Sequence, residues 1–173
     1  MLINKLLRKI YKLFYDFRAT IYVLNVRRKA KKCGRGLKVW GYTSINDNTC
    51  LGDHVSFNGM KIYGTGKVTI GDYFHSGNDC IMLTSNHNYQ GNAIPYDNTE
   101  IQKEITIEDF VWIGSRVTVL GNVTIGEGAI IQAGSVVVNN IPKYGIAGGN
   151  PARVFKYRDA GHYEKLKSEK KFH

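Results

Sequence analysis

An aliphatic side chain recurs every six residues over much of the second half of this 173-residue chain. The positions are Ile107, Ile113, Val119, Ile125, Ile131 and Val137. Earlier stretches keep the same spacing, at Ile45, Leu51 and Phe57 and again from Ile70 through Ser76 to Met82. Glycine or an acidic residue often follows the aliphatic one, as in Ile113-Gly114. A short internal repeat of this kind is typical of solenoids.

A period of six fits a strand of about four residues followed by a two-residue corner. Each aliphatic side chain then points inward, and glycine, asparagine or aspartate takes the bend. Three sides close a triangular coil of about 18 residues, and coils stack at the strand spacing of about 4.8 Å. A β-sandwich of short strands is the alternative, but it would not keep one phase over six consecutive repeats. The sequence therefore predicts an all-β, parallel β-solenoid.

Composition favours one folded domain with extensions. Apolar residues make up 43% of the chain and charged residues 22%, which is enough for a core. We expect a basic amphipathic helical segment over 1–35, the repeat domain over 36–158 with a loop at 88–104, and a charged tail with a short helix over 159–173. The cysteines, an odd number without CxxC spacing, predict reduced thiols in a cytoplasmic protein. They are Cys33, Cys50 and Cys80.

The charge is concentrated at the N-terminus. Residues 1–32 carry ten Lys or Arg against Asp16, whereas the remaining residues carry 14 basic and 13 acidic side chains. Apolar residues recur at helical spacing between the basic ones, at Leu2, Leu6, Leu7, Ile10, Leu13, Phe14, Phe17, Ile21 and Leu24. This pattern predicts a basic amphipathic helix. Its apolar face either caps the open end of the solenoid or also rests on the inner face of the membrane through residues 1–32.

Three segments resemble the left-handed β-helix acetyltransferases, the hexapeptide-repeat family that includes galactoside, maltose and polysaccharide O-acetyltransferases. They are Ile70-Gly71-Asp72 leading to Thr84-Ser85-Asn86-His87, then Val111-Trp112-Ile113-Gly114-Ser115, then Ala147-Gly148-Gly149-Asn150-Pro151-Ala152-Arg153. The resemblance covers roughly residues 40–158. It implies a left-handed coil, a homotrimer, and acetyl-CoA as co-substrate with no metal required.

The resemblance also implies the active-site residues. His87 lies where the six-residue register breaks, and the register resumes only near residue 105. Histidine titrates near neutrality and suits removal of a hydroxyl proton, so His87 is the expected general base, with Ser115 at the oxyanion and thioester. The acceptor would meet Asn86, Tyr89 and Asp97. The cofactor would meet Trp112, Gly114, Ala133, Gly134, Gly149, Pro151, Arg153 and Lys156, with Lys143 and Arg158 adding charge nearby.

The other histidines lack such support. His54 and His75 are expected in repeat turns, and His162 and His173 in the tail, where they would be solvated or make local hydrogen bonds. Trp112 has an alternative role as an ordinary packing aromatic.

The expected function is transfer of an acetyl group to a sugar hydroxyl in cell-surface polysaccharide or lipopolysaccharide biosynthesis. The alternatives are a sugar N-acetyltransferase, a xenobiotic O-acetyltransferase, and a non-catalytic β-solenoid scaffold. A zinc hydratase of the gamma carbonic anhydrase type would need a His-x4-His pair, which the chain lacks. Binding of nucleic acid is disfavoured, because no basic groove with interleaved aromatic residues occurs outside the N-terminal segment.

Overall fold

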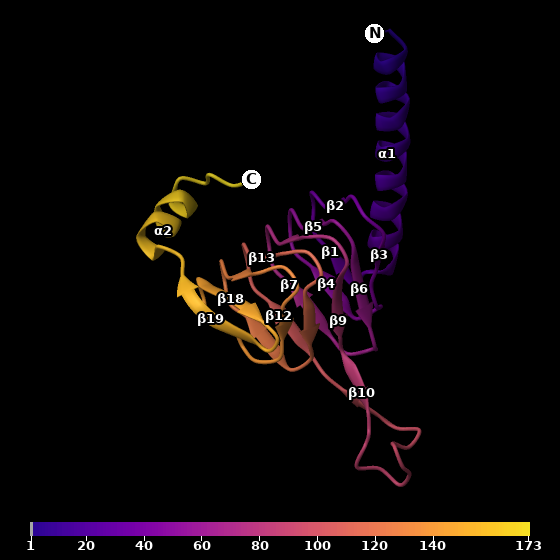
Figure 1. Cartoon of the computed structure of the whole chain (residues 1–173), viewed down its shortest axis with the longest axis vertical. Helices are drawn as coiled ribbons and strands as arrows, with labels where there is room; N and C mark the ends of the chain where they lie inside the picture. The colour runs from indigo at the N-terminus through magenta and orange to yellow at the C-terminus, as the bar shows by residue number, and fades with distance from the viewer. Residues whose placement is uncertain (1) are drawn as a thin grey trace.

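The structure, a computed structural model, describes residues 2–173 (Figure 1). A long N-terminal helix leads into a stack of β-coils, and a short helix follows the last coil. Met1, which begins the predicted segment 1–35, lies outside the described residues, as do the side chains of Leu2 and Leu6.

Three parallel sheets form the sides of the solenoid. The first contains β1 (Lys32–Cys33), β4 (Thr49–Leu51), β7 (Val68–Ile70), β12 (Ile105–Ile107) and β15 (Val123–Ile125). The second contains β2 (Lys38–Val39), β5 (Ser56–Phe57), β8 (His75–Ser76), β13 (Trp112–Ile113), β16 (Ile130–Ile131) and β18 (Gly145–Gly149), with β19 (Ala152–Tyr157) antiparallel at its edge. The third contains β3 (Thr43–Ser44), β6 (Met60–Tyr63), β9 (Cys80–Leu83), β14 (Thr118–Leu120) and β17 (Val136–Val137).

The inward positions of the repeat form the core. All six aliphatic residues from Ile107 to Val137 are at most 1% exposed. The earlier set, from Ile45 through Met82, is buried as well, including the hydroxyl-bearing Ser76. The predicted parallel β-solenoid is therefore confirmed.

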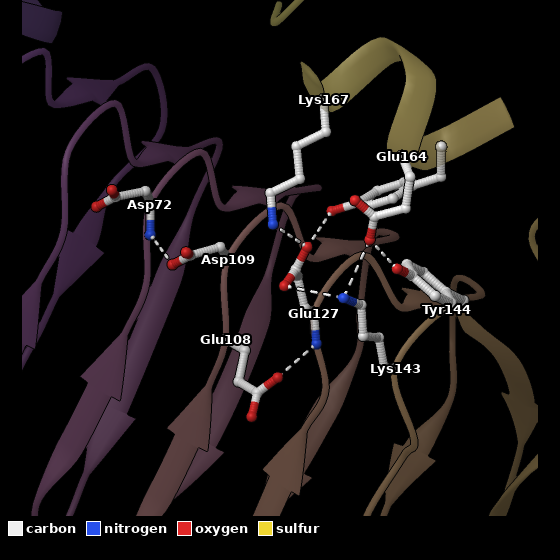
Figure 2. A network of polar contacts seen from close by, with 9 residues as sticks. Asp72, Glu108, Asp109, Glu127, Lys143, Tyr144, Glu164 and Lys167 are labelled. Carbon is white, nitrogen blue, oxygen red and sulfur yellow. Dashed lines mark hydrogen bonds and ion pairs between the residues drawn. The ribbon is translucent and has the colours of Figure 1, made fainter. Parts of the chain in front are cut away.

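The Ile-Gly-Asp motif has a structural reason. Asp109 accepts a hydrogen bond at 2.8 Å from the backbone N–H of Asp72 on the preceding coil (Figure 2). A Cβ atom at Gly71 would lie 2.3 Å from that carboxylate, so only glycine fits there. The carboxylate of each coil thus helps to fix the corner of the coil before it.

Aromatic side chains stack along one corner of the solenoid. His54, Tyr73 and Phe110 all adopt positive φ angles of 54–58°, a conformation that disfavours residues other than glycine. Their rings stack on one another, with centroid separations of 4.7 Å and 5.2 Å, which offsets part of that cost. His75 was predicted in a turn, and this is wrong: it lies in β8, because the strand starts one residue before the inward-facing Ser76.

The helix α1 (Leu2–Lys29) contacts the first coil from Tyr15 onward, where the ring of Tyr15 stacks on Trp40 with a centroid separation of 5.7 Å. Ala19 and Val26 are buried, and Tyr22 and Val23 pack against the core. The predicted apolar positions do not make this contact: the seven from Leu7 to Leu24 are 41–71% exposed. The prediction that they cover the solenoid is wrong, because the helix rests on its opposite side, which includes Ala19, Tyr22 and Val26.

The helix α2 (Ala160–Ser168) begins at the N-cap Asp159, which accepts a hydrogen bond from the backbone N–H of His162 at 2.8 Å. An ionic cluster joins α2 to the last coils (Figure 2). At its centre, Glu127 pairs with Lys167 of α2 at 2.5 Å and with Lys143 at 3.4 Å. Among residues 2–173, neither helix is long and apolar enough to span a bilayer.

Candidate active site

A two-stranded ribbon leaves the coil where the register breaks (Figure 1). It consists of β10 (Ser85–His87) and β11 (Glu100–Gln102), which pair antiparallel with His87 opposite Glu100. The solenoid resumes with β12 at Ile105. His87 is therefore exposed at the base of a projecting loop rather than packed inside a coil.

The imidazole of His87 is held by one aromatic contact. The ring of Tyr96 stacks on it with a centroid separation of 3.9 Å and an interplanar angle of 5°. Within residues 2–173, neither ring nitrogen has a hydrogen-bond partner. The stack thus restrains the exposed ring without engaging either nitrogen, and a proton acceptor needs an unengaged nitrogen.

The residues expected at the acceptor lie on the same ribbon. With its amide turned so that the oxygen faces Lys103, Asn86 accepts a hydrogen bond from the ammonium group at 2.9 Å. Tyr89 is exposed. Asp97 accepts hydrogen bonds from Thr99 and from the backbone N–H of Asn92, and these lower the pKa of its carboxyl group. In this structure Asp97 shapes the tip of the loop.

The small residues expected at the cofactor gather at another corner. Residues 114–115 follow β13, residues 132–134 follow β16, and residues 148–149 end β18. Because these three strands are neighbours, the three segments lie on successive coils. Ala133 and Gly134 are exposed, and a Cβ atom at Gly134 would meet nothing within 4 Å. The corner therefore presents an open, narrow strip with little side-chain bulk.

Part of this corner is also explained by the solenoid itself. A Cβ atom at Gly114 would lie 2.5 Å from the backbone nitrogen of Ala133. Ser115 accepts a hydrogen bond at 3.1 Å from the backbone N–H of Asn78 on the preceding coil. Close stacking of coils therefore requires glycine at 114 and favours a hydroxyl at 115.

Trp112 and the basic residues flank this strip. Trp112 is 50% exposed on the outer face of β13, between His75 and Ile130, so it is not a core residue. Pro151, Arg153 and Lys156 lie exposed at the turn into β19 and along it. Two other cations are engaged elsewhere: Lys143 pairs with Glu164 at 3.2 Å, and Arg158 donates to the carbonyl of Gly128 at 2.6 Å.

One chain does not bring the two halves of the site together. The strip lies where the chain enters the third sheet, and the ribbon of His87 lies where the chain leaves that sheet through β9. A four-residue strand spans about 13 Å. The histidine and the strip are therefore at opposite ends of the same sheet.

The repeat itself matches a known family. Residues 104–139 match the family described as bacterial transferase hexapeptide (six repeats). A hexapeptide-repeat acetyltransferase from Vibrio cholerae superposes with a TM-score of 0.67 at 29% identity, covering 76% of each chain. The predicted resemblance to the hexapeptide-repeat acetyltransferases is confirmed.

Two further solved structures of similar fold contain a bound ligand. The Vibrio cholerae protein has also been solved with acetyl coenzyme A, with a TM-score of 0.65 and 27% identity over 76% of this chain and 73% of that one. Galactoside acetyltransferase in complex with coenzyme A superposes with a TM-score of 0.69 at 28% identity, covering 82% of this chain and 70% of that one.

Curated relatives are longer than this chain. Serine acetyltransferase 4 of Arabidopsis thaliana is 29% identical over 75% of this chain, but the match covers only 29% of the plant protein. This hexapeptide-repeat chain spans less than half the length of the curated relatives that it matches.

The histidines, cysteines and acids of residues 2–173 do not gather into a three-ligand metal group. Cys33, Cys50 and Cys80 are free thiols.

Proposed function

We propose that this chain is an acetyl-CoA-dependent O-acetyltransferase that acts on a sugar hydroxyl, with His87 as general base. The observation that carries the proposal is the position of His87, which is exposed at the base of the loop that leaves the coil, with neither ring nitrogen hydrogen-bonded within the described residues. Structural relatives of the same fold bind acetyl-CoA or CoA, and galactoside and maltose O-acetyltransferases are among the structural relatives.

The chemistry follows from the residues. An alcohol is a weak nucleophile at neutral pH, so the Nε2 or Nδ1 atom of His87 takes the hydroxyl proton as the oxygen attacks the thioester carbonyl. The new carbon–oxygen bond forms, the carbon–sulfur bond then breaks, and the imidazolium returns the proton to the departing thiolate. Ser115 would donate a hydrogen bond to the oxyanion, a contact that stabilises charge as it develops.

The strip of small residues suits the pantetheine arm of the co-substrate. Ala133 and Gly134 leave its surface open, so an extended chain can lie against the coil backbone. Arg153 and Lys156 would meet the phosphates, because cations bind phosphate oxygens through charge-assisted hydrogen bonds. Both are exposed on β19 without an acidic partner in the described residues.

A homotrimer would complete the site. Because His87 and the strip lie at opposite ends of one sheet, each active site would combine the ribbon of one protomer with the strip of its neighbour. A three-fold arrangement repeats this heterologous contact and closes after three copies.

The test is the His87→Ala variant, assayed by acetyl-CoA consumption across free sugars, nucleotide-sugars and polysaccharide fragments. On the acceptor that the wild type uses, we expect turnover to fall by about 10²–10⁴-fold, the usual contribution of a general base, with unchanged binding of acetyl-CoA. The matched control is His162→Ala, which removes an exposed imidazole on α2 and should leave turnover intact. Full activity of His87→Ala would exclude His87 as the base.

A further inference from the structure

The helix α1 has two faces, and only one is used by the solenoid. Ala19, Tyr22, Val23 and Val26 contact the first coil. Phe17 lies nine positions before Val26, which at 3.6 residues per turn places it about 180° around the helix. The face centred on Phe17 therefore points away from the coil stack.

This outer face is strongly apolar. It carries Leu7, Ile10, Leu13, Phe14, Phe17, Ile21 and Leu24, all 41–71% exposed. The N-terminal half of α1 also extends past the coils (Figure 1), so most of the face has no part of the chain beside it. A continuous apolar surface of this extent marks an interaction site.

The polar residues in the N-terminal half of α1 are mainly basic. Lys5, Arg8, Lys9 and Lys12 precede the only acid of the helix, Asp16, and have no acidic partner in the described part of the chain. Near the other end, Lys29 pairs with Asp47 at 3.3 Å. At 3.6 residues per turn, Lys9 borders the apolar face, whereas Lys5, Arg8 and Lys12 lie on the opposite, polar side of the helix. The helix thus combines an apolar face with a basic polar face.

We propose that α1 docks the protein on an anionic lipid surface, with its outer apolar face buried at the boundary between headgroups and acyl chains. Such surfaces bind amphipathic helices that have a basic polar face and exposed Leu and Phe on the other face. A second copy of α1 fits the face less well, because its excess of basic charge would repel the same charge on its partner. The proposal is independent of the acetyltransferase function.

The contact with β2 and β3 fixes how the protein would lie. Because the solenoid holds the inner side of α1, the helix would lie along the surface with the coils on the far side from the lipid. Binding then requires no unfolding or reorientation of the solenoid.

The first measurement is flotation of the full-length protein with vesicles. We expect at least tenfold stronger binding to vesicles of phosphatidylcholine with phosphatidylglycerol than to phosphatidylcholine alone, and weaker binding at high salt, which screens the cations. Equal or absent binding to both kinds of vesicle would overturn the proposal.

The second measurement uses the combined variant Leu13→Ser, Phe14→Ser and Phe17→Ser. These side chains are exposed, so the fold should persist by circular dichroism, and binding to the anionic vesicles should fall at least tenfold. The control is Tyr63→Ser, which removes an exposed aromatic from β6 and should bind as the wild type does. Unchanged binding by the triple variant would overturn the proposal. The proposal would also be overturned if the wild type bound no vesicles and instead formed a lipid-free assembly that the triple variant dissociates. The apolar face would then be a contact between two copies of the chain.

Discussion

The imidazole ring of His87 is positioned by an aromatic neighbour. Its ring lies parallel to that of Tyr96 at 3.9 Å, and no hydrogen bond within residues 2–173 orients it. A general base must point its lone pair at the acceptor hydroxyl. The stacked tyrosine would therefore act as a positioning residue, limiting rotation of the imidazole while leaving both nitrogens accessible.

Replacing that ring should slow the reaction without weakening cofactor binding. Aromatic stacking contributes about 1 kcal/mol beyond area burial, so Tyr96→Ala should lower kcat by about fivefold with an unchanged KM for acetyl-CoA. Tyr96→Phe keeps the stacked ring and should restore kcat. The measurement is steady-state kinetics of all three proteins, and an unchanged kcat in Tyr96→Ala would assign the stack to loop structure alone.

The sequence could locate His87 but not its partner. The six-residue register ends at the histidine, and that break is visible in the sequence. Tyr96 lies in the loop 88–104, where no periodicity constrains which side chain folds back onto which. Asp97 shows the same limit: it was predicted to face the acceptor, while its hydrogen bonds to Asn92 and Thr99 became visible only in the structure.

Among the elements, α1 shows what amphipathicity can and cannot predict. The spacing of Leu and Phe correctly indicated a helix with one apolar face. It did not indicate which surface covers that face. The solenoid selected the opposite side, where the smaller Ala19 and Val26 allow close approach to the coil, whereas bulky Phe14 and Phe17 remain outside.

The attachment of α2 depends on a partly buried carboxylate. Glu127 is 17% exposed and accepts hydrogen bonds from Lys167 and Tyr163. Burial alone would raise the pKa of its carboxyl group, but these hydrogen bonds and the nearby Lys143 outweigh it and lower the pKa. Because the pKa of this carboxyl group is lowered in the folded protein, its ionisation stabilises the fold at pH values above the ordinary pKa of 4.5. This contribution is lost as the pH falls through the pKa that the group has in the folded protein.

Glu127→Gln should therefore destabilise the protein in a pH-dependent way. We expect the free energy of unfolding in urea to drop by about 1–3 kcal/mol at neutral pH, because the variant leaves Lys167 without its carboxylate partner and removes one of the two carboxylates that pair with Lys143. As the pH falls through the lowered pKa of Glu127, the wild-type carboxylate becomes protonated, and the difference should shrink. Glu104→Gln, an exposed acid outside the cluster, serves as control. A difference between Glu127→Gln and the wild type that does not change with pH would contradict this account.

At the scale of the whole molecule, the six-residue period was sufficient for the architecture. Every inward position from Ile107 to Val137 is buried, because a fixed strand-and-corner length sends the same phase into the core on each side of the triangle. The left hand of the coil and the trimer came only from the family resemblance. Periodicity within one chain contains no information about a neighbouring copy or about handedness.

The placement of the two half-sites leads to a prediction about mixed assemblies. His87→Ala removes the base from the ribbon, and Ala133→Trp places a large side chain on the exposed strip of small residues. Each variant alone should be inactive. If each active site combines the ribbon of one protomer with the strip of its neighbour, co-expressed chains that mix at random should regain activity at about a quarter of the sites, where an intact ribbon meets an intact strip.

The readout is acetyl-CoA consumption by the co-purified mixture, compared with the two variants purified separately and then combined without subunit exchange. Recovery only in the co-expressed sample would support a site shared between protomers. If both half-sites instead acted within one chain, neither variant could supply what the other lacks, and the mixture would stay inactive whatever its composition. The double variant His87→Ala with Ala133→Trp, co-expressed with the wild type in equal amounts, gives a second comparison. A site shared between protomers then predicts activity at about a quarter of the sites, whereas a site within one chain predicts activity at about half of them.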